Sequence, residues 1–456
     1  TSGIALYTGG TVGGTINATG GDIDAKNGAI NVYSDKGTIN FKGATINTAA
    51  NSLTFMKGAN GGIVDFINPT TANIATNGTV FYMAPSVSPA PTVPTYGTFT
   101  GLSASDVASF HNLNNLTLNM SKDSNIAVAS YVESDLSNLG GTSIASLGFH
   151  LSGSPDYKTY LLYKSKLTAD SGTTYADFKK IALSNSTIIN DTTLSTSDNN
   201  VNLMTQENIE TNKDWVQLIN NKTIELTGTN SLAMYASNGK IKNSVGASIT
   251  IGDTGTAIYG KNKGAGDTDI ENSGDITVGQ GSTGIYSKGG NVTLDAGSKL
   301  NIGTNDAVGV YYVGDGGTIT SNAGNMTIGD SSYGFVIKNA GSIGNNLTTS
   351  ASTNVTMGND TVYVYNNGAG NIVNNTNLAS TGNENYGVYS AGNVTNNGTI
   401  NFGTGLGNVG IYSISGGTAV NNAPITIGDS DTGNSKFGIG MAAGYETSDT
   451  GNIVNN

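Results

Sequence analysis

Short apolar segments recur along the chain in one pattern: an apolar residue, a Thr or Asn, and a second apolar residue, followed by Gly. The glycines that close this pattern are Gly252, Gly279, Gly303, Gly329, Gly358, Gly403 and Gly428. Their spacing is about 25 residues, except for one gap of twice that length in which Thr381-Gly382 is a degenerate member. The alternation of apolar and polar positions predicts a short strand before each glycine.

A second motif runs in phase with the first and consists of a small residue, an apolar residue and Tyr. Its tyrosines are Tyr235, Tyr259, Tyr286, Tyr311, Tyr389 and Tyr412. A third strand begins near a Gly-Asn or Asn-Asn turn, and the hexapeptide at 370–375 recurs at 451–456. Each repeat therefore contains three short strands and three turns.

These repeats predict an all-β fold, a right-handed parallel β-helix (β-solenoid). Each strand is too short to form a face that packs alone, but coils stacked about 4.8 Å apart place identical residues in continuous ladders. A propeller blade of the WD40 type needs about 40 to 45 residues, more than this period supplies. Gly and Asn tolerate positive φ at the corners, and the right hand follows the preference of parallel crossovers.

The period divides the chain into three parts. We expect regular coils over 1–83, irregular coils with protruding loops and short helices over 84–224, and regular coils again over 225–456. In the regular parts, the residues before the glycines, Ile251, Val278, Ile302 and Ile328, should form one stacked ladder.

The middle part, 84–224, loses the period. Four of the seven prolines lie between residues 85 and 94, which predicts an extended loop that leaves the spine. Residues 103–111 and 173–180 are candidates for short helices. Leu116 to Met120 and Ile126 to Ala129 still alternate like coil strands, so irregular coils are expected to continue here.

The composition narrows the class of protein. Disordered chains usually have few β-branched and aromatic residues and a high charge, whereas here Ile, Val, Thr and 21 Tyr recur and only 11% of residues are charged; this favours ordered β structure. The chain has no Cys, so disulfides cannot stabilise it. A net charge of -12 argues against nucleic acid as a partner. No apolar run approaches the roughly 20 residues that span a bilayer, and no signal peptide is recognisable.

Candidate chemistry is sparse, and we expect no catalytic residues, no metal and no cofactor. The acidic residues of the repeats, such as Asp253, Asp330 and Asp429, follow turn glycines and are interpreted as solvated turn residues. The only histidines are His111 and His150, too few for a zinc triad. The repeated tyrosines are interpreted as packed in the core or stacked laterally rather than as a sugar-binding ladder.

The best binding candidates lie in the middle part, where aromatic side chains with polar tips gather: His150, Tyr157, Tyr160 and Tyr163. Such side chains suit contacts with glycans or proteins. Packing of an irregular coil is the competing interpretation. Because this part also holds the only Trp, Trp215, we expect any binding surface here and a spacer role for the regular coils.

Three stretches carry a family resemblance: the Gly-Ile-Tyr-Ser coil at 284–287, the Asn-Asn-Gly-Thr-Ile-Asn-Phe coil at 396–402, and residues 102–118. These stretches resemble the passenger domains of the very large fusobacterial type V autotransporter adhesins. The resemblance extends over essentially the whole chain. The resemblance implies a β-helical stalk displayed at the outer-membrane surface, which mediates coaggregation with other bacteria and attachment to host cells during virulence.

The expected function is therefore that of an extracellular, non-catalytic adhesin segment that binds a surface protein or glycan of partner bacteria or host cells. We expect a monomer without membrane contact, excised from a longer chain that holds the signal peptide and the anchor. Two alternatives stay open. A surface glycan-degrading enzyme would need two carboxylates about 5 to 10 Å apart in a groove; a purely structural stalk would need none.

Overall fold

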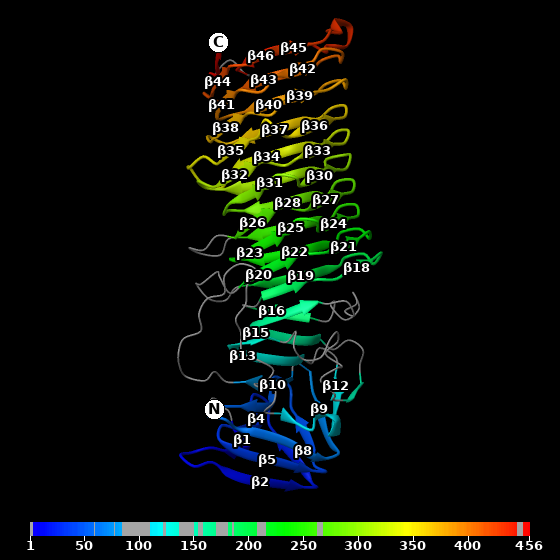
Figure 1. Cartoon of the computed structure of the whole chain (residues 1–456), viewed down its shortest axis with the longest axis vertical. Coiled ribbons are helices and arrows are strands. Elements are labelled where there is room, and N and C mark those ends of the chain that lie inside the picture. Colours follow the sequence, from blue (N-terminus) through cyan, green and yellow to red (C-terminus); the bar gives the residue numbers. More distant parts are fainter. Residues whose placement is uncertain are drawn as a thin grey trace. The chain divides into compact units, whose positions relative to one another are not determined.

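The structure is a computed structural model, and it describes most of the chain. The described ranges are 3–58, 60–76, 78–83, 110–121, 125–135, 150–153, 158–169, 181–184, 187–207, 216–261, 268–444 and 450–456. The chain divides into two compact units, the first formed by 1–192 with 206–210 and 214–216, the second by 193–205, 211–213 and 217–456. Both are parallel β-solenoids with coils of about 25 residues, as the sequence predicts (Figure 1).

The first unit is built from three parallel sheets. One contains β1 (Ile4–Thr8), β4 (Ile30–Ser34), β7 (Leu53–Lys57), β10 (Thr79–Met83), β13 (Asn125–Asp135), β15 (Lys158–Ala169), β16 (Ile181–Ser184) and β17 (Thr187–Asn190). The second contains β2 (Gly14–Thr19), β5 (Gly37–Lys42), β8 (Ile63–Asn68) and β11 (Phe110–His111). The third contains β3 (Asp22–Ala25), β6 (Thr45–Thr48), β9 (Thr70–Ile74), β12 (Leu116–Met120) and β14 (His150–Gly153).

Aromatic side chains fill the core of the first unit. Phe41, Phe55 and Phe66 are all fully buried. The rings of Phe41 and Phe66 are stacked with centroids 5.7 Å apart, and Phe55 meets both edge-on. Inward residues of successive coils therefore superpose as the repeat requires, because Phe41 and Phe66 occupy the same position of adjacent strands.

The irregular middle part continues the parallel pairing where the structure describes it. β12 pairs with β9 and β13 pairs with β10, which confirms the two strands predicted there. The helix predicted over 103–111 is wrong at its end, because Phe110 and His111 form β11 and pair with Val64 and Asp65. The local signals for a helix start are outweighed there by backbone hydrogen bonding to the edge of β8. The rest of that segment and 173–180 lie outside the described residues, within which there is no α-helix.

The second unit also has three parallel faces. The first carries β22 (Leu232–Ser237), β25 (Thr256–Lys261), β28 (Thr283–Lys288), β31 (Val308–Gly314), β34 (Tyr333–Asn339), β37 (Val362–Asn367), β40 (Tyr386–Ser390), β43 (Val409–Ser413) and β46 (Ile439–Ala443). The second carries β20 (Gln217–Asn220), β23 (Lys240–Asn243), β26 (Asp269–Asn272), β29 (Val292–Leu294), β32 (Thr318–Ser321), β35 (Asn346–Thr349), β38 (Asn371–Asn374), β41 (Asn393–Asn396), β44 (Thr418–Asn421) and β47 (Asn452–Asn455).

The third face holds the strands that end at the repeated glycines. They are β18 (Leu194–Thr196), β21 (Thr223–Leu226), β24 (Ser248–Ile251), β27 (Asp275–Val278), β30 (Lys299–Ile302), β33 (Asn325–Ile328), β36 (Asn354–Met357), β39 (Leu378–Ala379), β42 (Ile400–Phe402) and β45 (Ile425–Ile427). β19 (Asn202–Glu207) contributes residues to both units. In the described residues of 225–456 the first face has nine strands, as expected for about nine coils, and the degenerate repeat is the two-residue strand β39.

The predicted ladder of inward side chains is confirmed. Ile251 pairs with Val278, Val278 with Ile302, and Ile302 with Ile328. All four side chains are buried, whereas the residue that precedes each of them in its strand faces outward. Burial of these ladders is the main apolar stabilisation that such short strands can supply.

Polar side chains also face inward, and they form ladders of their own. Asn374 donates a side-chain hydrogen bond to Asn396, and Asn396 donates one to Asn421; both donor–acceptor distances are 2.7 Å. Each amide also donates to a backbone carbonyl two residues further along its own turn. The buried amides are thus satisfied between coils, as a dry interior demands.

Candidate interaction surfaces

The structure separates the binding residues that the sequence predicts. His150 begins β14, where it lies opposite Thr117 of the third sheet. Tyr160 and Tyr163 both lie on β15 of the first sheet, and Tyr163 is opposite Ala129 and Ser184. Tyr160 stands at an irregularity of that pairing, between the paired residues Thr159 and Leu161. Tyr157 lies outside the described residues, and the binding role of the four stays a prediction.

A tyrosine ladder lies on the outside of the second unit. Its members occupy one outward position of the first face: Tyr235, Tyr259, Tyr286 and Tyr311 in consecutive coils, and Tyr365, Tyr389 and Tyr412 further along. Neighbouring ring centroids are 4.8 to 5.2 Å apart, in stacked and edge-on pairs. This confirms lateral stacking, which the sequence left as an alternative to core packing.

Local backbone packing explains why the tyrosines point outward. In β28 the buried residues are Gly284, Ile285 and Ser287, while Tyr286 is only partly buried. A Cβ atom added at Gly284 would lie 2.6 Å from the carbonyl oxygen of Gly309, so the small residue of the motif allows the strands to approach. Ile285 then points inward, and alternation turns Tyr286 outward.

The tyrosine ladder has apolar neighbours, and together they make one face of the second unit unlike the other two. We call this the tyrosine face and define it as the outward side chains of β22, β25, β28, β31, β34, β37, β40 and β43. Besides the tyrosines of the ladder it includes the partly exposed Leu232, Tyr333, Val362 and Tyr386, and the buried Val308, Val336 and Val409. Thr256 and Thr283 occupy the position of Val308 in the two preceding coils. Outward residues of β24, β27, β30 and β33 are instead Ser248, Thr250, Asp275, Thr277, Lys299, Asn301, Asn325 and Thr327.

The hydroxyl groups of Tyr259, Tyr286 and Tyr333 stay protonated over the physiological pH range. Partial burial raises the pKa of Tyr259, Tyr286 and Tyr333 above its usual value. The ammonium group of Lys338 lies 5.3 Å from the ring centroid of Tyr311, in cation–π geometry. The tyrosine face therefore offers apolar ring surface with polar tips and an adjacent cation.

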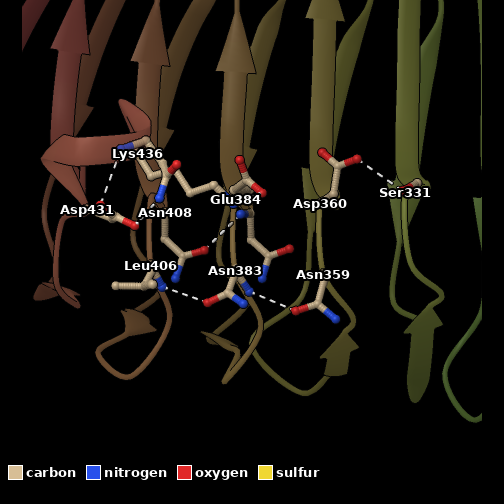
Figure 2. A network of polar contacts seen from close by, with 11 residues as sticks. Ser331, Asn359, Asp360, Asn383, Glu384, Leu406, Asn408, Asp431 and Lys436 are labelled. Atoms are coloured by element: carbon tan, nitrogen blue, oxygen red, sulfur yellow. Dashed lines mark hydrogen bonds and ion pairs between the residues drawn. The ribbon is translucent and has the colours of Figure 1, made fainter.

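A ladder of turns runs beside this face, at the start of its strands. The side chain of Asp330 accepts a hydrogen bond from the backbone N–H of Asn359, whose side chain accepts one from the N–H of Asn383. Asn383 in turn accepts from the N–H of Leu406 (Figure 2). A carboxylate or amide oxygen of each of these coils thus accepts a backbone hydrogen bond from the coil that follows it. The prediction that Asp330 is a solvated turn residue is incomplete, because its exposed carboxylate also joins coils.

The last turn of this ladder is longer and folds over earlier ones. It includes η6 (Thr432–Asn434), whose cap Asp431 accepts hydrogen bonds from the backbone of Gly433 and Asn434. Hydrogen bonds from Asn434 hold the pKa of Asp431 below its usual value. Lys436 forms an ion pair of 2.8 Å with Glu384, which lies in the turn before β40, two coils earlier (Figure 2). That ion pair raises the pKa of Lys436.

Groups capable of catalysis or metal binding are dispersed in the described part of the chain. The carboxylate of Asp253 accepts a hydrogen bond from the backbone N–H of Gln280, the role that Asp330 has three coils later, and Asp429 is exposed. His111 is exposed on β11. Within the described ranges, no three Asp, Glu or His side chains gather closely enough to hold a metal ion. No helix of these ranges has the length and hydropathy that crossing a membrane requires.

Comparisons with family models, with curated proteins and with solved structures found no match. The class of protein is therefore defined by the fold itself, a parallel β-solenoid.

Proposed function

We propose that this chain is a non-catalytic segment of a cell-surface adhesin, displayed outside an outer membrane. The observation that carries the proposal is the unbroken register of the second unit, which repeats one coil along β22 to β46. Such a stack projects a surface over a distance that grows with each coil, and the parallel β-solenoid fold is common in adhesins and autotransporter passengers. Its partner would be a surface protein or glycan of another bacterium or of a host cell.

The turn carboxylates support a non-catalytic role. Asp253 and Asp330 occupy equivalent turns and accept backbone hydrogen bonds from the following coil. A glycoside hydrolase instead directs two carboxylates into one groove, about 5 to 10 Å apart. Turnover of any glycan by the purified chain would contradict this part of the proposal.

The test of adhesion compares three proteins: the intact chain, a chain in which residues 96 to 185 are replaced by regular coils, and Tyr157→Ala/Tyr160→Ala. Each is immobilised on beads, and binding to partner bacteria and host cells is counted. If the predicted site is correct, the intact chain binds, and both variants lose most of the binding. Undiminished binding by the replaced chain would move the site to the regular coils.

A purely structural stalk is the second candidate, and the regular coils favour it. Two faces of the second unit repeat short polar residues such as Thr250, Thr277 and Asn301, which offer few anchors for a partner. In that case none of the three proteins would bind cells.

A further inference from the structure

The tyrosine face has the composition of a protein interface. Tyr and apolar residues are enriched where proteins associate, because they bury ring surface and still supply hydrogen bonds. The other two faces of the same unit carry mainly Thr, Asn, Ser and charged residues at equivalent outward positions, with Val373 and Val420 as apolar exceptions. Packing of the coil cannot explain this difference, since all three faces close the same core.

The tyrosine face is also large enough for a stable dimer. Its eight strands, spaced about 4.8 Å apart, cover roughly 40 Å along the stack, and outward residues of each strand span roughly 20 Å. The product is roughly 800 Å² per partner, which is the size of a standard specific interface.

Opposite charges flank this face along its two edges. The basic edge lies at the ends of the strands, where Lys261 pairs in register with Lys288, and Lys338 follows two coils later. The acidic edge lies in the turns before the strands and consists of exposed carboxylates: Asp253, Asp306, Asp330 and Asp360. Both edges reach the rings, because Lys338 lies over Tyr311, while Asp306 and Asp360 add to the effect of burial in raising the pKa of Tyr333.

We propose that the tyrosine face is a homodimer interface, on which a second copy of this chain packs face to face and parallel. A two-fold axis along the stacking direction keeps each coil at its own height and exchanges the two edges. The basic edge of one copy then meets the acidic edge of its partner, and like coils face each other. The antiparallel arrangement, with the axis parallel to the strands, would place acidic edge against acidic edge. Opposite charges thus select the parallel dimer.

The register of this dimer follows from the coil positions. Lys261 and Asp253 belong to the same coil, so each lies opposite the other across the two-fold axis, and the same holds for Lys338 and Asp330. This assembly differs from the monomer that the sequence predicts. It is also independent of adhesion, because it concerns the purified chain alone.

The first experiment measures the mass of the intact chain by sedimentation over a wide range of protein and salt concentrations. A dimer is expected at low salt, with Kd rising as salt screens the charged edges. The variant Tyr259→Thr/Tyr286→Thr/Tyr311→Thr, which gives the face the residues of its neighbours, should be monomeric. A matched control changes three outward residues of another face, Thr277→Asn/Asn301→Thr/Thr327→Asn, and should dimerise like the parent.

Charge variants test the predicted pairs. Lys338→Gln and Asp330→Asn should each raise Kd several-fold, and the double variant should lose less than the product of the two effects. Asn at 330 can still accept the backbone hydrogen bond, as Asn359 and Asn383 do in later coils, so folding is preserved. Multiplicative effects would contradict this pairing and hence the parallel register.

Single cysteines test the polarity of the dimer, since the chain has no other Cys. Face-to-face sheets lie about 10 Å apart, so a short bis-maleimide is the appropriate cross-linker for Tyr235→Cys, Tyr286→Cys and Tyr412→Cys. All three should give cross-linked dimers in the parallel arrangement, whereas an antiparallel one permits at most one of them. A monomer at every concentration, or an intact chain whose tyrosine face binds a glycan instead of a second copy, would overturn the proposal.

Discussion

Residues 301 and 302 lie side by side in β30 but face opposite environments. Ile302 is buried in its ladder, while the Asn301 side chain faces outward and donates a hydrogen bond to Thr277. Ile302→Asp should lower the free energy of unfolding by about 4 kcal/mol or more, through lost packing and a buried carboxyl. Asn301→Asp should change it by less than about 0.5 kcal/mol. Urea unfolding of both variants measures this, and equal midpoints would show that the inward and outward assignment is wrong.

Tyr363 provides a prediction about pH, because its side chain is fully buried. Its hydroxyl donates a hydrogen bond of 3.2 Å to Thr376, and burial raises its pKa to about 12. In the unfolded chain the pKa is about 10. Between these values the folded protein keeps a proton that the unfolded chain loses, so stability is complete below pH 10 and falls as the pH rises towards 12.

The loss over that window should be on the order of 2 kcal/mol for this group. Tyr363→Phe should cost about 1 kcal/mol at pH 7, for the lost hydrogen bond, and should show a smaller fall of stability above pH 10 than the parent. Denaturant unfolding at pH 7, 10 and 11.5 measures both effects. An identical alkaline slope in parent and variant would contradict the burial argument.

The orientation of single residues could be predicted where strands alternate strictly, as in β30. It was ambiguous for the tyrosine motif, because Gly284 and Ile285 are both buried and interrupt the period of two. Only the close approach of the glycine backbones to the next coil shows that Tyr286 points outward. No signal in the sequence distinguishes this face from a packed core, since both favour an apolar residue beside Tyr.

Among the elements, the inward turns after β38, β41 and β44 depend on stacked amides. Asn396 receives a hydrogen bond from Asn374 and donates to Asn421 and to the carbonyl of Gly398. Asn396→Ala should therefore cost about 2 to 4 kcal/mol, since three buried hydrogen bonds are lost. Hydrogen exchange should accelerate mainly in the coils on either side, because each coil contacts only its neighbours.

The matched control for that variant is Asn393→Ala, in the same strand β41. Its amide donates to Asn371 at an exposed position, where water can replace the partner. Its Oδ1 also accepts a hydrogen bond of 3.2 Å from the exposed backbone N–H of Thr418. The expected cost is below about 1 kcal/mol, and hydrogen exchange should be unchanged outside β41 except at Thr418. Comparable costs for the two variants would mean that the inward ladder contributes no more than the surface one.

This ladder explains a sequence repeat whose cause was not visible in the sequence. The hexapeptide at 370–375 recurs at 451–456, and Asn374 and Asn455 are its fifth residues. Asn421 donates to Asn455 just as Asn374 donates to Asn396, so both copies place an amide in the same stack. The helix prediction over the residues of β11 failed because it rested on local signals, the Ser and Asp that favour a helix start, whereas the strand forms through long-range pairing with β8.

At the scale of the whole molecule, the period alone predicts the parallel solenoid, because strands this short can form a packed, hydrogen-bonded sheet only when successive coils stack. It could not predict where the binding candidates would lie, since His150 and Tyr163 are assigned to different sheets only by pairing with distant strands. The charged edges of the tyrosine face were equally hidden, because each combines residues from several coils.

If the coil is the physical unit of the fold, whole coils should be removable and partial coils should not. Deletion of residues 279–302 joins Val278 to Gly303 and leaves β25 beside β31, where Tyr259 would stack on Tyr311 and Ile258 on Val310. Every downstream strand keeps its face, so this variant should retain a cooperative thermal transition and resistance to protease. Deletion of residues 279–290 removes half a coil, shifts the next strands off their faces and exposes the ladder of Ile251 and Val278. It should be cleaved near the junction under conditions that leave the whole-coil deletion intact. Equal resistance of the two deletions, measured by limited proteolysis and circular dichroism, would refute the coil as the unit of stability.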